Sequence, residues 1–301
     1  MTAVAPSVYT HGHMSRRSPT TAPAALAALA LAAALTGGLA TGCETPEPKS
    51  ALGYTEDARR AYEAAFEELK SKNYLEAQQR FREVKRKYHY SKYAKLAELR
   101  IADADFEQEK YAESIRGYRQ FVHDHRSDAE EVSYARSKIA EAQYKQIGDS
   151  FLLPSADERD QAVILDAFKE LKGYVQDYPR GKDTAKVREL LADVVARLMR
   201  HELYVARFYL DRDNFEAAVL RIQYAMRNFA QVPTSRGPAG AELVDSGLEA
   251  EALLLLGEVY LKMKKYPEAR GAFESILRDF ARSPLTLQAQ NYLAYMKERG
   301  V

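Results

Sequence analysis

A pattern of small and aromatic residues recurs along most of this 301-residue chain and limits the folds that it can adopt. The clearest copy spans residues 253–280. In each copy a small residue is followed four positions later by an aromatic or branched one, and apolar residues recur at three- and four-residue spacing, which predicts helices. The small residues of the four copies are Ala77, Ser114, Ala218 and Ala269.

The pattern resembles the tetratricopeptide repeat (TPR), a helix-turn-helix unit of about 34 residues. The small residue lets the two helices cross closely, and the larger residues around it fill the space between them. One helix pair cannot bury its apolar face alone, so successive repeats must stack. The sequence therefore predicts an all-α fold, a TPR-type α-solenoid of about five helix-turn-helix repeats.

Some units are less regular than the consensus. Residues 128–147 and 160–178 are expected to form a further helix pair with a long connection between them. Residues 183–211 are expected to form one long helix, and residues 231–240 a loop, while no strand pattern is found. We assign repeats 1–3 to an N-terminal half, residues 54–180, and repeats 4–5 to a C-terminal half, residues 181–301.

The N-terminal 42 residues have the organisation of an export signal. Residues 22–39 are almost all Ala and Leu, Arg16 and Arg17 precede them, and small residues lead to Cys43, the chain's one cysteine. A basic start, a short apolar run and a small-residue cleavage site are typical of a signal peptide. The apolar run is too short and too Ala-rich for a comfortable membrane span. Either Met1 or Met14 can be the start.

The four residues that end in Cys43 resemble the lipobox of bacterial lipoproteins, with Ala40 where Leu is usual. The resemblance implies that residues 1–42 are removed and that Cys43 is lipidated. Plain secretory cleavage and an uncleaved anchor are the alternatives. Residues 43–53 are polar and contain two prolines, so we expect a flexible linker, with the first helix beginning near Thr55 as its N-cap.

The charge balance bears on the class of partner. Lys and Arg number 44 against 43 Asp and Glu, whereas a nucleic-acid binder usually shows a basic excess. We therefore expect no nucleic-acid partner. Residues 80–95 nevertheless interleave basic residues with tyrosines. Three interpretations are open: a single-stranded nucleic-acid surface, a solvated helix end with packed tyrosines, or attraction to anionic lipid headgroups or an acidic partner. The solvated helix end is favoured.

Groups that could support catalysis or bind a metal are few. His201 and Glu202 begin like a zinc-protease motif, but Val205 stands where the second histidine is needed. The segment His123-Asp124-His125 could bind a metal, although a solvated helix end is the simpler interpretation. We expect no catalytic residues, no metal and no cofactor, and therefore no enzyme activity.

Three stretches resemble the BamD family, the TPR lipoproteins of the outer-membrane β-barrel assembly machinery. They are residues 87–106, 158–179 and 197–215, with His89 where the family commonly has Pro. The third stretch is the most specific, because generic TPRs do not need its Glu202 or Arg212. The resemblance implies a protein anchored in the outer membrane and facing the periplasm. It implies contact between the C-terminal half and a POTRA domain of the barrel-forming BamA subunit, and binding of unfolded outer-membrane proteins by the N-terminal half. Other lipoproteins of the complex would be further partners.

The first two repeats offer a candidate peptide groove. Its expected residues are Arg59, Tyr62, Phe66, Lys70 and Phe106. Aromatic surface flanked by cations suits a peptide that ends in an aromatic residue and a carboxylate. The alternative is that Phe66 belongs to the core between repeats.

Arg197 and Arg212 are the candidate contacts to the barrel subunit, with intrahelical salt bridges as the alternative. A rival function is another envelope TPR lipoprotein scaffold: a secretin pilotin, or a Tol-Pal type coordinator of cell-wall constriction.

Overall fold

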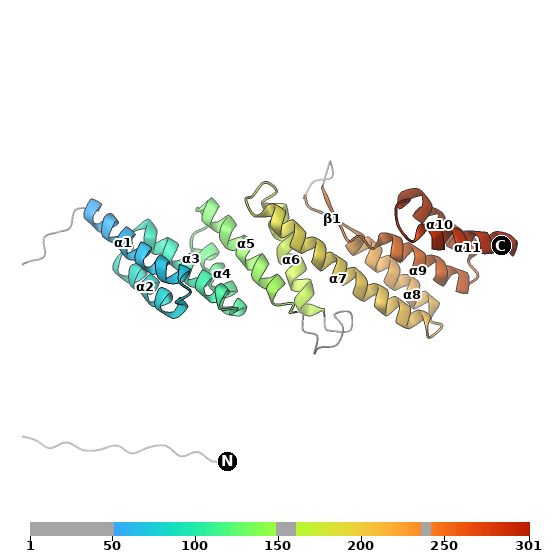
Figure 1. The fold of residues 1–301 in the computed structure, drawn as a ribbon, viewed down its shortest axis with the longest axis horizontal. Helices are drawn as coiled ribbons and strands as arrows, with labels where there is room; N and C mark the ends of the chain where they lie inside the picture. Colours follow the sequence, from blue (N-terminus) through green and yellow to red (C-terminus); the bar gives the residue numbers. More distant parts are fainter. Residues whose placement is uncertain (1–50, 149–160, 236–241) are drawn as a thin grey trace, which may run out of the picture. The chain divides into compact units, whose positions relative to one another are not determined.

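The computed structural model describes residues 51–148, 161–235 and 242–301 (Figure 1). Cys43 and the predicted signal peptide lie outside these ranges. The described elements, in chain order, are α1 (Ala51–Lys70), α2 (Tyr74–Lys87), α3 (Lys92–Glu107), α4 (Tyr111–Asp124), α5 (Ala129–Lys145), α6 (Ala162–Asp177), α7 (Thr184–Leu210), α8 (Phe215–Ala225), a π-helix η1 (Met226–Ala230), β1 (Gln231–Pro233), β2 (Leu243–Asp245), α9 (Glu249–Lys262), α10 (Tyr266–Asp279) and α11 (Thr286–Glu298).

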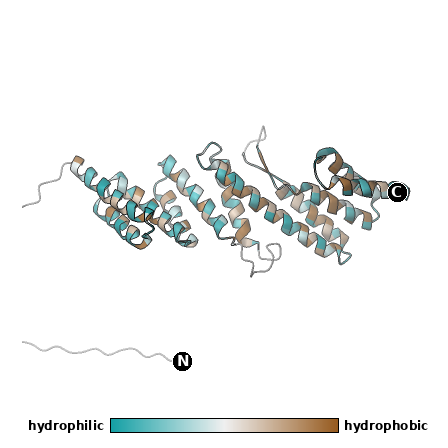
Figure 2. Ribbon diagram, in the orientation of Figure 1, coloured by the Kyte–Doolittle hydropathy of each residue, from teal (hydrophilic) through white to brown (hydrophobic). Residues whose placement is uncertain are grey.

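The helices associate in sequence order. From α1 to α11 each helix contacts the next, and the first helices of neighbouring pairs also contact in the pairs α1–α3, α5–α7 and α7–α9 (Figure 1). Figure 2 shows apolar and polar residues interleaved along the helices, as expected for helices with one buried face. Five helix pairs followed by α11 confirm the predicted all-α, TPR-type solenoid.

The turn within a repeat has a recurring conformation. In four repeats a non-glycine residue adopts a left-handed conformation, with φ between 57° and 63°, two residues before the second helix begins. The second helix then starts with an aromatic residue. The left-handed residues are Lys72, Glu109, Asp213 and Lys264, and the aromatic residues are Tyr74, Tyr111, Phe215 and Tyr266.

The small residues of the repeat lie where the helices cross. Ala77, Ser114, Ala218 and Ala269 are all fully buried. Gly257 allows a still closer approach between α9 and α10, because a Cβ atom there would come within 2.4 Å of the Phe273 ring. The packing role that the repeat pattern predicts for small residues is therefore confirmed.

Buried residues form a chain of clusters. Around Phe81, α1, α2 and α3 pack together, and around Tyr118 a second cluster joins α3, α4 and α5. The largest cluster runs from α5 to α9, and a fourth, around Phe273, joins α9, α10 and α11. Each cluster thus shares helices with the next, as stacked repeats require.

Two sequence predictions need correction. Helix α1 begins at Ala51 rather than near Thr55, so residues 51–53 are helical and not linker. The Thr55 hydroxyl donates to the Ala51 carbonyl at 3.0 Å, as a residue inside a helix does, and therefore does not act as an N-cap.

The second correction concerns residues 231–240, which we predicted to be a loop in a chain without strands. Gln231–Pro233 instead pairs antiparallel with Leu243–Asp245. Val232 and Val244 face each other in this pairing and are both buried. The expected pair 128–147 and 160–178 corresponds to α5 and α6, and the long helix 183–211 to α7. None of the described helices is long and apolar enough to span a membrane.

Candidate functional site

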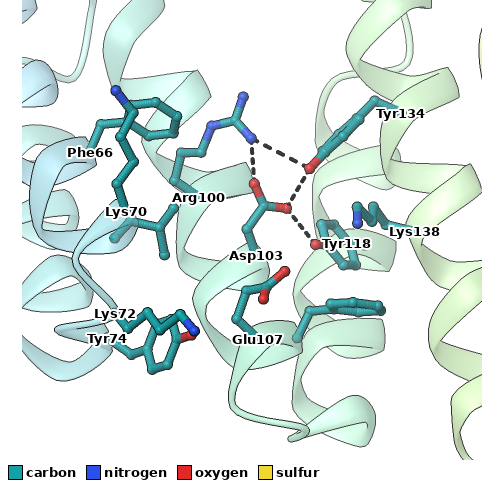
Figure 3. A pocket seen from close by; sticks show the side chains of 12 residues that line it. Phe66, Lys70, Lys72, Tyr74, Arg100, Asp103, Glu107, Tyr118, Tyr134 and Lys138 are labelled. Carbon is teal, nitrogen blue, oxygen red and sulfur yellow. Dashed lines mark hydrogen bonds and ion pairs between the residues drawn. The ribbon is translucent and has the colours of Figure 1, made fainter.

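An open cavity of about 300 Å³ is lined by side chains of the first two helix pairs and α5 (Figure 3). Three of the predicted groove residues, Phe66, Lys70 and Phe106, line it. The remaining lining residues are Leu69, Lys72, Tyr74, Arg100, Asp103, Glu107, Tyr118, Tyr134 and Lys138. The structure therefore brings part of the predicted set together and adds residues from α2, α4 and α5.

Asp103 is the polar centre of the cavity wall. Its carboxylate accepts hydrogen bonds from the hydroxyls of Tyr118 at 2.5 Å and Tyr134 at 2.9 Å, and it forms an ion pair with Arg100 (Figure 3). Asp103 is buried, so these three partners provide the interactions that water would otherwise supply. They also join α3 to α4 and α5.

The two tyrosines of this network are held as neutral donors. Burial raises the pKa of Tyr118 well above its usual range, and the adjacent Asp103 carboxylate raises it further. The pKa of Tyr134 is raised by the same two causes. Both hydroxyls therefore keep their protons, and continue to donate to Asp103, across the pH range in which proteins ordinarily work.

Arg100 connects the network to the first repeat. Its Nε donates to the Tyr62 hydroxyl at 3.0 Å, and its guanidinium carbon lies 5.4 Å from the Phe66 ring centroid. Tyr62, a predicted groove residue, does not line the cavity; by accepting this hydrogen bond it helps to orient Arg100, which does.

Cations surround the aromatic part of the cavity. The Lys70 ammonium lies 4.9 Å from the Phe66 ring centroid, and the Lys138 ammonium lies 4.5 Å from that of Phe106. The lining contains four cations (Lys70, Lys72, Arg100 and Lys138) against two carboxylates (Asp103 and Glu107). Such a surface can accept an aromatic side chain and an adjacent carboxylate together.

Like Tyr62, Arg59 is a predicted groove residue that the structure places outside the cavity lining. Its guanidinium donates to Glu63 at 2.9 Å and forms an ion pair with Glu56, both on α1. It does not line the cavity described above. Lys70, which was predicted, lines the cavity, and Lys72, which was not, adds a further cation there.

Arg197 and Arg212 have different surroundings. The Arg197 side chain is 13% exposed and donates to Asp193 at 2.7 Å, while the Tyr144 hydroxyl donates to the same carboxylate oxygen at 3.0 Å. Arg197 thus helps to join α7 to α5. Arg212 is exposed, and its guanidinium carbon lies 3.4 Å from the ring centroid of Phe208, which is itself 44% exposed.

The His123-Asp124-His125 segment contributes hydrogen bonds at a helix end. His123 contacts Asp124 at 2.9 Å, and His125 contacts Glu98 of α3 at 3.0 Å. Within residues 51–148, 161–235 and 242–301, no three His, Cys, Asp or Glu side chains are grouped so that they could hold a metal ion.

The stacked helix pairs define a TPR protein, and residues 251–283 match the tetratricopeptide repeat family. Residues 55–238, more than half of the chain, match the YfiO family, described as outer membrane lipoprotein, and the chain belongs to that family. The resemblance to BamD proteins is thereby confirmed.

Curated relatives agree with this assignment. The outer membrane protein assembly factor BamD of Caulobacter vibrioides is 28% identical over 244 residues, which cover 81% of this chain and 73% of the relative. BamD of Neisseria meningitidis serogroup A is 22% identical over 231 residues, covering 76% and 81%. The solved TPR2AB domain of yeast Sti1 in its pHSP90 complex is 11% identical, covers 74% of this chain and 77% of its own, and has a TM-score of 0.39, too low to add to the argument.

Proposed function

We propose that this protein is an outer membrane protein assembly factor that acts as a lipid-tethered scaffold. Its N-terminal groove would bind a segment of an unfolded outer-membrane protein, and its C-terminal half would dock on the barrel-forming subunit. Family membership and the function named for the BamD relatives support this role. The observation that carries the substrate part is the meeting of Phe66, Phe106 and the lysines around them in one cavity.

The chemistry of the cavity favours one kind of peptide end. An aromatic side chain can pack against Phe66 and Phe106, where each well-oriented ring pair contributes about 0.5–1.5 kcal/mol beyond its buried area. A terminal carboxylate beside it would meet Lys70 and Lys72 at the mouth. At about 300 Å³ the cavity holds a single large side chain rather than a folded partner.

The two other parts of the proposal concern the ends of the chain. Cys43 would carry the lipid that holds the protein on the periplasmic side of the outer membrane. At the end of α7, Arg212 and Phe208 present a cation stacked on an exposed ring, which suits a POTRA domain of the barrel subunit. Arg197 would act there indirectly, by fixing α7 against α5. Accessory lipoproteins of the complex are further proposed partners.

The groove can be tested by fluorescence anisotropy with a labelled peptide that ends in phenylalanine and a free carboxylate. Lys72→Glu should weaken binding about tenfold, because a repulsive charge replaces an attractive one at the mouth. Glu109 occupies the equivalent turn with nearly the same φ, so the substitution suits the backbone.

Lys264→Glu is the matched control. Lys264 has φ 59° at the same turn position of the last repeat, and it does not line the groove. The Lys264→Glu protein should bind the peptide with the affinity of wild type. When the peptide's carboxylate is amidated, wild type and Lys72→Glu should bind it equally well. If both variants bind the peptide equally well, the proposed groove is wrong.

A further inference from the structure

The C-terminal end of α2 and the turn after it carry a set of exposed cations. We call this set the basic cluster: Arg82, Lys85, Arg86, Lys87 and Lys92. Tyr90, within the same turn, is 88% exposed, more than any other large hydrophobic side chain in the described ranges. The last turns of α2 and the start of α3 thus present five positive charges and one exposed aromatic ring, with Glu83 as an exposed carboxylate in the same stretch.

The basic cluster lies beside the start of α1. The Tyr54 hydroxyl lies 3.5 Å from the Lys87 carbonyl oxygen, to which it donates. The Tyr54 and Tyr88 rings pack edge to face with centroids 5.4 Å apart. The last turn of α2 is therefore fixed next to the point at which the described chain begins.

Chain length limits how far the basic cluster can be from a lipid on Cys43. Eight peptide links separate Cys43 from Ala51, the first residue of α1. Even a fully extended chain of that length spans only about 28 Å. This step rests on the proposed lipidation of Cys43. Given that anchor, the start of α1 stays within this length of the lipidated residue, and the end of α2 that carries the basic cluster is fixed beside that start.

Other repeats show that the fold does not require cations at this position. A basic last turn is favourable at a helix C-terminus, which would be the simplest explanation of Lys85, Arg86 and Lys87. Yet the corresponding helices α4, α6 and α10 end in Asp124, Asp177 and Asp279. Among these four helices, α2 alone ends in lysine, Lys87, where the others end in aspartate.

Few members of the basic cluster form ion pairs within the part of the protein that the structure describes. Lys85 contacts Glu98 at 3.0 Å, and the Lys87 and Lys92 ammonium groups lie over the rings of Tyr88 and Tyr93. Arg82 and Arg86 form no ion pair within the described residues. The cluster is therefore available to an anionic surface.

We infer that the basic cluster and Tyr90 contact anionic phospholipid headgroups of the leaflet that holds the anchor. Groups of about four to eight basic residues beside an anchor are attracted to such headgroups, and exposed tyrosines favour the membrane interface. Helix α2 would then point its C-terminal end at the bilayer. Tyr74, at its other end, lines the peptide cavity, which would stand about 20 Å further from the headgroups.

A single-thiol probe can test this contact in the mature, lipidated protein. Acylation of Cys43 leaves no other cysteine, so a fluorophore on His89→Cys would report from the turn after α2. Arg126→Cys provides the matched control, because Arg126 occupies the same point after α4, one residue beyond the C-cap. Vesicles of phosphatidylcholine with about one third phosphatidylglycerol would be compared with phosphatidylcholine alone, each with a headgroup-attached quencher.

In the anionic vesicles, quenching at position 89 should exceed quenching at position 126 about threefold or more. The excess should disappear in phosphatidylcholine, in high salt, and when Lys85, Arg86 and Lys87 are all replaced by glutamate. Equal quenching at the two positions, or an excess that does not depend on lipid charge, would overturn the inference alone. Protein that fails to float with the vesicles would overturn the proposed anchor and this inference with it. An unchanged melting temperature would show that the triple variant is folded.

Discussion

At the scale of single residues, Glu141 links the candidate groove to the second half of the solenoid. Its carboxylate accepts hydrogen bonds from Lys138 at 3.3 Å and from Lys186 of α7 at 2.8 Å. Lys138 also lies over the Phe106 ring in the cavity. One carboxylate on α5 therefore fixes a cation of the groove and, through the second lysine, the position of α7.

Glu141 should give folding a specific pH dependence. Burial acts to raise the pKa of its carboxyl, but the hydrogen bonds and charges of Lys186 and Lys138 outweigh burial and lower the pKa below the usual 4.5. A carboxyl with a depressed folded-state pKa stabilises the protein above its unfolded pKa, and this contribution is lost as pH falls through the folded value.

Glu141→Gln should therefore reduce the free energy of unfolding by about 1–2 kcal/mol at pH 7. The difference from wild type should shrink as pH falls through the lowered pKa of the wild-type carboxyl, which then also becomes neutral. Urea denaturation at a series of pH values measures both effects. Glu131→Gln, on the same helix, is the control for loss of one charge from α5, because Glu131 pairs with Lys95 and not with Lys138 or Lys186. A difference that stays constant from pH 7 to pH 3 would contradict the assignment.

Some groove residues could be predicted from the sequence, and others could not. Phe66, Lys70 and Phe106 follow from the repeat pattern, because it identifies which helix of each pair they occupy. Arg59 shares that helix, but Glu56 and Glu63, three residues before it and four after it, pair with it locally. The structure shows a different arginine at the groove.

Arg100 was not found because its partners lie far apart in the sequence. Tyr62, Asp103 and Tyr134 belong to three different helices, and only the packed fold brings them to one guanidinium. One sequence feature could have indicated the network. Asp103 stands between Ala102 and Ala104 on a helix that is largely apolar there, and a carboxylate at a buried position needs partners.

At the scale of elements, close helix crossing is the feature that a single methyl group can test. Gly257 of α9 faces the Phe273 ring of α10 at a distance that excludes a Cβ atom. Gly271 also lies within a helix, α10, but a Cβ atom there would have no neighbour within 4 Å. The two glycines therefore separate the effect of packing from the effect of helix propensity.

Gly257→Ala should destabilise the protein by about 1–3 kcal/mol, because the methyl group must displace the Phe273 ring or separate the two helices. Gly271→Ala should instead stabilise it by about 0.5–1 kcal/mol, as alanine favours a helix interior over glycine. Thermal denaturation followed by circular dichroism would measure both. Melting temperatures that shift in the same direction would show that the crossing does not depend on the missing side chain.

The helices were predictable, whereas the hairpin was not, and the reason is length. Repeated small and aromatic residues mark a helix pair over about 30 positions, so a few mismatches do not hide it. The strands β1 and β2 have three residues each and bury one side chain each. Three residues are too few to show the alternation of apolar and polar residues by which strands are recognised in a sequence. Pro233 at the end of β1 also disfavours a strand.

At the scale of the whole molecule, stability is distributed along the chain. The cluster around Phe81 draws on α1, α2 and α3, and the cluster around Phe273 draws on α9, α10 and α11. The two clusters share no helix. In arrays of this kind, stability is approximately a sum of repeat contributions and contacts between neighbours, so damage should stay local.

Phe81→Ala should cost about 3–5 kcal/mol and raise amide hydrogen exchange in α1–α3 while leaving α9–α11 almost unchanged. Phe273→Ala occupies the same repeat position in the last unit and should give the reverse pattern. Hydrogen-exchange mass spectrometry measures both variants in one experiment. If either variant accelerates exchange uniformly from α1 to α11, the chain unfolds as one cooperative unit instead.

The succession of contacts from each helix to the next also determines how this chain can reach its native state. No described helix has to wait for a partner from the distant end of the sequence, so contact order is low and the entropic cost of closing each loop is small. A chain delivered from its N-terminus can complete the groove of the first repeats before the last helix arrives. Early segments then spend little time with exposed apolar faces, which limits the opportunity for aggregation during delivery.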